Sequence, residues 1–351
     1  MIASRYRGSL AVWALLLAYA SLYPFVPLRP TSLESVVAFF SRPRFIPSSD
    51  VALNVLAYLP MGTLACLYFR QASERGRSIL KATALGAGFS FAMETAQLFI
   101  PYRVASIYDV FANAAGALGG ALVFADPFYS LVTRPLGERR EAWVIPGGWG
   151  DAALVLLSLW IIAQLNPALP FFGAGNIVDT GEGLGGLAAL QWLAVAMSIC
   201  GFGLYVSAIL KGETGALRAT LALLSVALWL KFMAASFMLQ PHFAEEWLGS
   251  GRVMGLLAGV LALVPLRRLP RAWRIYLALV FVFAGALFSK IFGAYGALEE
   301  LLQLFRWPYG QLASFASLTQ FLHEAWPFLA LLYLIALFLR VRHHPEGKMA
   351  A

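Results

Sequence analysis

The chain has 351 residues, of which 60% are hydrophobic and only 13% are charged, and its mean hydropathy is +0.73. An average soluble domain carries about 25% charged residues, so this composition excludes an ordinary soluble enzyme, a disordered chain and a fibrous repeat. The apolar runs are continuous rather than alternating, which disfavours an outer-membrane barrel. We therefore predict an all-α fold, a polytopic bundle of transmembrane helices.

The formal net charge is +8. The basic residues lie between the apolar runs, so they indicate membrane orientation and contact with anionic lipid rather than binding to nucleic acid. Cys66 and Cys200 both fall inside apolar runs. We interpret them as small buried residues that form neither a disulfide nor a metal site.

Ten apolar runs have roughly the length of about 20 residues that a helix needs to cross a bilayer. They are 9–28, 51–69, 82–101, 108–126, 152–168, 187–210, 216–238, 253–267, 275–293 and 325–341. With the N-terminus in the cytoplasm, 18 lysines and arginines lie in the inner connections and termini and 6 in the outer connections. This bias follows the positive-inside rule. We predict ten spans, with both termini in the cytoplasm.

Proline, glycine and mixed charge mark the segment 127–150 as a cytoplasmic linker. The linker separates a four-helix membrane domain, 1–126, from a six-helix membrane domain, 151–351. On the outer side, Thr31 and Glu34 have the spacing of a capping box and precede an apolar stretch, so we expect a short helix there on the membrane surface.

Polar side chains of the first domain gather near the outer ends of three predicted helices. Within each helix they are three or four residues apart, so they share a face. They are Asp50 and Asn54; Ser90, Glu94 and Gln97; and Asp109 and Asn113, with Arg103 in the turn between the last two helices. Short loops bundle these helices, so the sequence predicts one outward-facing polar pocket. Because polar groups are costly in a membrane, a functional pocket is favoured over the alternative, a purely structural polar network.

Small residues of the first domain indicate close helix packing, which drives association in lipid. They are Gly86, Gly88, Gly116, Gly119 and Gly120. Pro60 and Gly62 are expected to interrupt and kink the helix that carries them.

An ordered series of residues resembles the VanZ-like family over residues from about 10 to 126. The series is Asn54, Pro60-Met-Gly62, Glu94-Thr-Ala-Gln97, Arg103, Asp109, Asn113, Gly116 and Gly119. The resemblance implies a multi-pass protein of the bacterial inner (cytoplasmic) membrane. The namesake of the family is associated with resistance to lipid-tailed glycopeptide antibiotics, particularly teicoplanin. No established reaction comes with the family, so the resemblance implies a location and an important pocket.

The second half contains an echo of this series. Glu300-Leu-Leu-Gln303-Leu-Phe resembles Glu94-Thr-Ala-Gln97-Leu-Phe. No Asp/Asn pair follows, so we interpret the echo as a degenerate VanZ-like repeat. Glu300 and Gln303 are therefore secondary site candidates, together with Ser90.

Three functions remain open from the sequence. In the first, the outward pocket binds a lipid-linked envelope intermediate or an acylated glycopeptide, and modifies it if chemistry occurs. Arg103 would contact a phosphate or carboxylate, the amides would donate hydrogen bonds, and Glu94 and Asp109 would act as base and acid or hold a cation. The second is a transporter or flippase, and the third is a non-catalytic scaffold that binds envelope-assembly proteins. No cofactor motif and no set of residues with metal-ligand spacing is present in the sequence, and whether the protein is an enzyme stays open.

Overall fold

The structure is a computed structural model that describes residues 2–41, 48–101, 103–172, 191–212, 215–240, 250–292, 302–306 and 310–343. Within these ranges the secondary structure is helical, and pairing between extended residues is confined to isolated bridges. The predicted all-α class is confirmed. The chain divides into two compact units, Met1–Arg139 and Arg140–Ala351. The division falls inside the segment 127–150.

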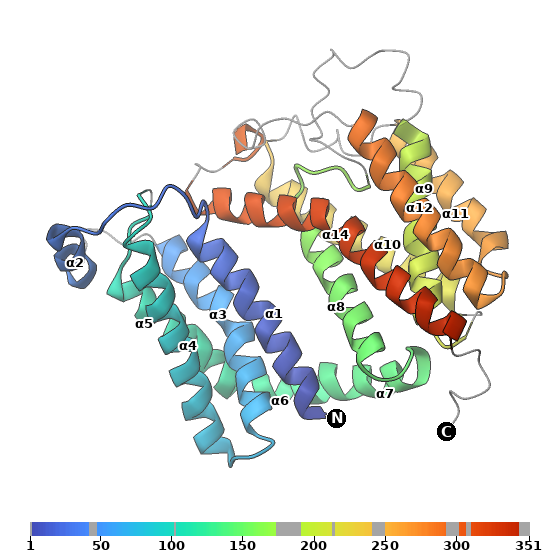
Figure 1. The fold of residues 1–351 in the computed structure, drawn as a ribbon. Helices are drawn as coiled ribbons and strands as arrows, with labels where there is room; N and C mark the ends of the chain where they lie inside the picture. The colour runs from blue at the N-terminus through green and yellow to red at the C-terminus, as the bar shows by residue number, and fades with distance from the viewer. Residues whose placement is uncertain are drawn as a thin grey trace. The chain divides into compact units, whose positions relative to one another are not determined.

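The first unit contains a bundle of helices that lie side by side (Figure 1). Its helices are α1 (Ile2–Leu22), α2 (Leu33–Phe40), α3 (Ser48–Phe69), α4 (Arg75–Gln97) and α5 (Ile107–Gly119). Beyond α5 the chain continues through the π-helical turns η1 (Gly120–Phe124) and η2 (Phe128–Thr133), the short α6 (Ala125–Pro127) and α7 (Arg134–Trp143). Residues 127–143 of the predicted linker 127–150 are therefore helical.

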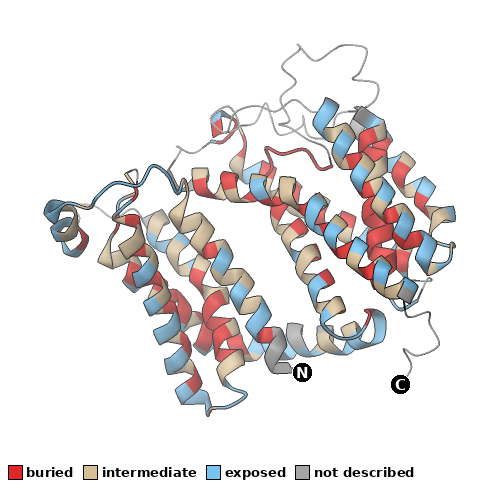
Figure 2. Ribbon diagram, viewed as in Figure 1, coloured by how far each residue is buried: buried red, intermediate tan, exposed pale blue. Residues whose placement is uncertain are grey.

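Helices α3, α4 and α5 contact one another most extensively, and α1 packs on α3 and α4. Figure 2 shows buried residues on the faces of α3, α4 and α5 that turn toward the bundle. Glycines make the α3–α5 contact close, because a Cβ on Gly116 would lie 2.3 Å from the carbonyl oxygen of Val55. On α3, Gly62 likewise packs closely against the backbone of Ala117 in α5. These glycines replace side-chain bulk with backbone contact, as helix association in lipid favours.

Three features of the first unit differ from what the sequence predicts: the role of Gly88, the effect of Pro60 and the cap of the short helix. Gly88 has no atom within 4 Å of a Cβ placed there, so this glycine does not serve helix contact. Pro60 lies inside α3, which runs from Ser48 to Phe69 without the expected interruption. The expected short helix exists as α2, but its N-cap is Ser32, whose hydroxyl accepts a hydrogen bond from the Ser35 amide at 3.1 Å. A hydroxyl at the cap bonds the third helical amide, which here selects Ser32 over Thr31.

The described part of the second unit has six helices of 16 residues or more. They are α8 (Gly148–Ala163), α9 (Gln191–Ile209), α10 (Ala216–Met238), α11 (Ser250–Leu266), α12 (Arg271–Phe292) and α14 (Gly310–His343). Helix α9 is central, since α11 and α12 make the most extensive contacts of the unit with it. Of its segment Trp192–Ile209, 78% is buried. Glycines again allow close approach, at Gly201 against Val282 and at Gly255 against Trp192.

Six helices of the described chain are long and apolar enough to cross a membrane. Their spans are Asp50–Phe69, Ile107–Leu131, Trp192–Ile209, Ala216–Met238, Arg271–Ile291 and Ala313–Arg342. Three further apolar helices are shorter: Tyr6–Leu22, Gly148–Ala163 and Val253–Leu266. Helix α4 is in neither group; it carries Lys81, Glu94 and Gln97, whose polarity lowers its hydropathy. The count of ten spans and the side on which the termini lie stay predictions.

Candidate functional site

The predicted pocket residues of the first unit come together at one end of the bundle. Asp50 and Asn54 lie in the first turns of α3, and Glu94 and Gln97 lie at the end of α4. Asp109 and Asn113 lie in the first turns of α5, which begins after the turn that carries Arg103. Because α4 runs opposite to α3 and α5, its last turn meets their first turns.

The outermost layer of this cluster joins α3 to α5. Asn54 Nδ2 donates to Asp109 Oδ1 at 2.9 Å. Both side chains are only partly buried, and so is Asp50, which is near enough to Asp109 for their like charges to interact. The close contact of Gly116, two turns further along α5, holds the two helices at this spacing. We name Asp50, Asn54 and Asp109 the mouth of the site.

Glu94 lies behind the mouth and is only 6% exposed. Its Oε2 accepts a hydrogen bond from the Ser106 amide at 3.0 Å, and Ser106 Oγ in turn accepts one from the Tyr108 amide at 3.2 Å. Ser106 is the N-cap of α5. A carboxylate at a helix N-terminus is stabilised by the unpaired amides and the positive end of the helix dipole. Glu94 therefore fixes the start of α5 beside the end of α4.

Arg103 and Gln97 bind the end of α1. Arg103 Nε donates to the Tyr23 carbonyl oxygen at 3.0 Å and its Nη2 to that of Ala20 at 2.9 Å. Gln97 Nε2 donates to the Ser21 carbonyl oxygen at 2.8 Å. Burial lowers the pKa of the Arg103 guanidinium, and the charge of Glu94 acts in the opposite direction. Terminal carbonyls of a helix have no partner within it, and these two side chains supply one.

The innermost layer joins α4 to α5. Asn113 Nδ2 donates to Ser90 Oγ at 2.8 Å, and the two residues are 4% and 0% exposed. One further oxygen here, Asn113 Oδ1, is buried with no hydrogen-bond partner among the described residues, and the buried Tyr58 hydroxyl lies beside Ser90. A buried acceptor without a partner is costly, which makes this layer suited to a bound polar species.

Two further residues of this cluster, Tyr58 and Ser106, were not predicted from the sequence. Tyr58 is four residues after Asn54, so it lies on the same face of α3. Ser106 precedes the apolar start of α5 by one residue, which is an N-cap position. Both positions are evident from the sequence, but the sequence does not indicate which side chains or amides these two residues contact.

The secondary candidates of the second unit do not form a comparable cluster among the described residues. Gln303 is exposed, and its backbone carbonyl accepts from Gln240 Nε2 at 2.9 Å. Glu300 lies outside the described residues. Arg306 donates from Nε to the Leu239 carbonyl oxygen at 2.5 Å, at the end of α10. Arg306 thus bonds to the end of a helix, as Arg103 does at the end of α1. The degenerate VanZ-like repeat in the second half stays a prediction.

The apolar helices and their glycine-mediated packing define a helical membrane protein. Residues 8–130 match the model of the VanZ/LLP1 family, and we refer to this part of the chain as the VanZ-like domain. A search of the curated proteins and a search of the solved structures each found no match.

Proposed function

We propose that the VanZ-like domain lies in a bacterial inner membrane and presents its mouth outward, to bind the polar end of an amphiphile. The ligand is a lipid-linked envelope intermediate or an acylated glycopeptide such as teicoplanin. The observation that carries the proposal is the partly exposed pair Asn54–Asp109, with Asp50 beside it, above the buried Glu94. Partly exposed carboxylates at a helix end are accessible to a ligand from the aqueous side.

The charges of the mouth favour a particular kind of headgroup. Asp50 and Asp109 are acceptors, whereas the Nε and Nη2 donors of Arg103 bond to carbonyls of α1. Contact of Arg103 with a phosphate of the ligand stays a prediction. A ligand rich in hydroxyl or N–H donors, as in sugars and peptides, complements such carboxylates. We therefore assign ligand contact to the mouth, and support of the helix ends to Glu94, Gln97 and Arg103.

Binding is tested with the full-length protein extracted in mild detergent. Lipidomics of the purified wild type is expected to detect a co-purifying amphiphile with a hydroxyl- or amide-rich headgroup. Asp109→Asn and Asp50→Asn are expected to lose that molecule while expressing normally, because they remove the charge but keep the shape. Ser130→Ala is a matched control, since Ser130 Oγ is exposed and bonds only to nearby carbonyls among the described residues.

The outcomes separate the proposal from its alternatives. Retention of the ligand by both Asp→Asn variants would refute the role of the mouth. Movement of a labelled lipid or solute across reconstituted vesicles would favour the transporter or flippase. A partner protein that co-purifies with wild type and variants alike, in the absence of lipid, would favour the scaffold.

A further inference from the structure

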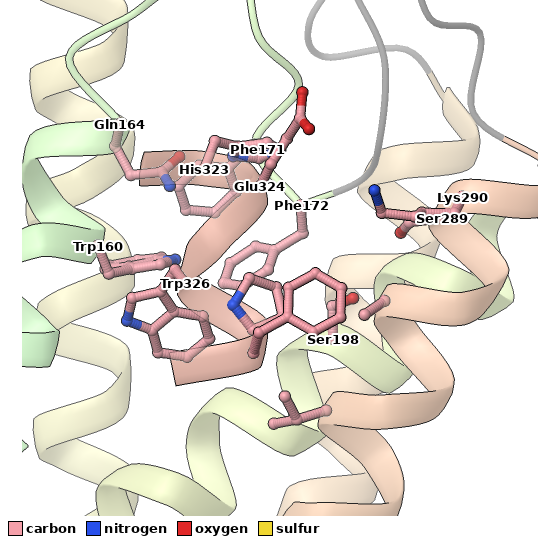
Figure 3. Close-up of a pocket in the computed structure, with 14 residues that line it drawn as sticks. Trp160, Gln164, Phe171, Phe172, Ser198, Ser289, Lys290, His323, Glu324 and Trp326 are labelled. Carbon is pink, nitrogen blue, oxygen red and sulfur yellow. The ribbon is translucent and has the colours of Figure 1, made fainter. Parts of the chain in front are cut away.

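A cavity lies within the second unit, away from the residues that match the family model. Its volume is about 70 Å³, and it is lined by residues of α9, α12, α14 and the end of α8 (Figure 3). Aromatic side chains form much of its wall: Trp160, Phe171, Phe172 and Trp326. In Figure 3, Gln164, His323 and Glu324 lie on one side of Phe172, and Ser289 and Lys290 lie on the other.

Gln164 is the first indication of a ligand. The side chain is 2% exposed, and its Oε1 is buried with no hydrogen-bond partner among the described residues. A buried carbonyl oxygen in this state is destabilising unless a donor reaches it. Glu324 lines the same cavity; its Oε1 accepts from Gln320 Nε2 at 3.2 Å, and a carboxylate has capacity for further donors. This side of the cavity therefore favours a group that donates hydrogen bonds.

The aromatic wall favours a cation among such donors. Trp160 and Phe172 have ring centroids 5.4 Å apart, and Phe171 and Phe172 meet edge to face at 5.0 Å. The faces of such rings attract ammonium groups, and tryptophan does so most strongly. An ammonium bound here would have aromatic side chains, an amide oxygen and a carboxylate around it.

The opposite side of the cavity carries the complementary charge. Lys290 is exposed, and its Nζ lies 5.9 Å from the ring centroid of Phe328. Ser289 is its neighbour in the cavity lining and provides a hydroxyl. A lysine and a hydroxyl together suit a phosphate group. One cavity thus presents acceptors on one side and a cation on the other.

We propose that this cavity binds the headgroup of a zwitterionic ammonium phospholipid. The ammonium lies against the aromatic wall and donates to Gln164 Oε1 and Glu324, and the phosphate lies toward Lys290 and Ser289. The acyl chains stay outside the cavity. The proposal uses only residues of the second unit and does not depend on the function proposed for the VanZ-like domain.

The test is a lipid titration of the full-length protein followed by native mass spectrometry. Phosphatidylethanolamine is the zwitterionic probe, and phosphatidylglycerol, which has the phosphate but no ammonium, is the comparison. We expect the wild type to bind phosphatidylethanolamine preferentially. Gln164→Leu is expected to weaken that binding about tenfold through loss of a hydrogen bond to a charged group, and Gln164→Glu to maintain or tighten it. Ser158→Ala, on an exposed position of α8, is the matched control and should bind as the wild type does.

Equal binding of the two lipids by the wild type would overturn the proposal. Undiminished binding of phosphatidylethanolamine by a folded Gln164→Leu variant would also overturn it. Should Gln164→Leu fail to fold, Lys290→Met decides, because this residue is exposed and its replacement leaves the core intact. Loss of the preference in Lys290→Met supports the phosphate contact, and an unchanged affinity refutes it.

Discussion

The close contact of α3 with α5 and with the turn η1 that continues it is predicted to control both stability and the geometry of the mouth. A Cβ on Gly120 would lie 2.1 Å from the Leu59 carbonyl oxygen and 2.9 Å from the Thr63 amide nitrogen. A carbon normally approaches a carbonyl oxygen to about 3.3 Å, so Gly120→Ala has to move the helices apart by about 1 Å. Overpacking of this kind costs about 1–3 kcal/mol, and the better helix propensity of alanine returns about 1 kcal/mol.

Moving the two helices apart also weakens a hydrogen bond between them. Thr63 Oγ1 donates to the Gly120 carbonyl oxygen at 3.1 Å, and loss of such a hydrogen bond costs about 1 kcal/mol. We therefore expect Gly120→Ala to lower the free energy of unfolding by about 2 kcal/mol. The assay is denaturation of the purified protein in detergent, with Trp fluorescence as the signal.

Gly88→Ala is the matched control in the same domain. A Cβ at Gly88 has no atom within 4 Å, so this substitution gains helix propensity without a clash and is expected to stabilise the protein by up to about 1 kcal/mol. If Gly120→Ala is as stable as Gly88→Ala, the α3–α5 contact is not as close as the glycines indicate, and the reasoning is refuted.

Three further predictions concern single contacts, each measured by the same denaturation assay. Ser106→Ala removes the N-cap of α5 and is expected to cost about 1 kcal/mol, whereas Ser32→Ala, the cap of the exposed α2, should leave global stability unchanged; equal effects would contradict this. Thr319→Val removes the buried hydroxyl that accepts from Asn166 Nδ2 at 2.9 Å, with an expected loss of about 1–3 kcal/mol, and a neutral result would show that the bond is not formed. Asp126→Ala breaks exposed ion pairs with Arg70 and Arg75 and should cost less than about 1 kcal/mol, decreasing as salt is added; a large, salt-independent loss would contradict it.

Much of the fold could be predicted because hydrophobic runs are local signals. Each of the ten apolar runs contains or overlaps a helix of the structure. The i, i+4 spacing of Asp50 with Asn54 and of Asp109 with Asn113 also placed these pairs on common faces before any packing was known. The exact caps were harder, since Thr31 and Ser32 are both good capping residues and only the backbone turn distinguishes them.

The partners of the site residues could not be predicted. Arg103 was expected to face a ligand, yet two of its nitrogens bond to carbonyls at the end of α1, about 80 residues earlier in the chain. Such a contact depends on where α1 ends and how it packs on α4, and no local pattern specifies that. Tyr58 was overlooked for the same reason: its position on α3 is evident, but its burial beside Ser90 requires the bundle.

By itself the sequence determined that this is an all-α protein with apolar helices, and that a polar cluster lies at the ends of three of them. These properties follow from hydrophobicity and helical periodicity, which act over a few residues. The tertiary structure alone decided which members of the cluster are exposed at the mouth and which are bonded inside. It also brought residues of four separate segments around the aromatic cavity of the second unit. Both outcomes depend on the packing of helices distant in sequence, where glycine contacts and buried hydrogen bonds select one arrangement.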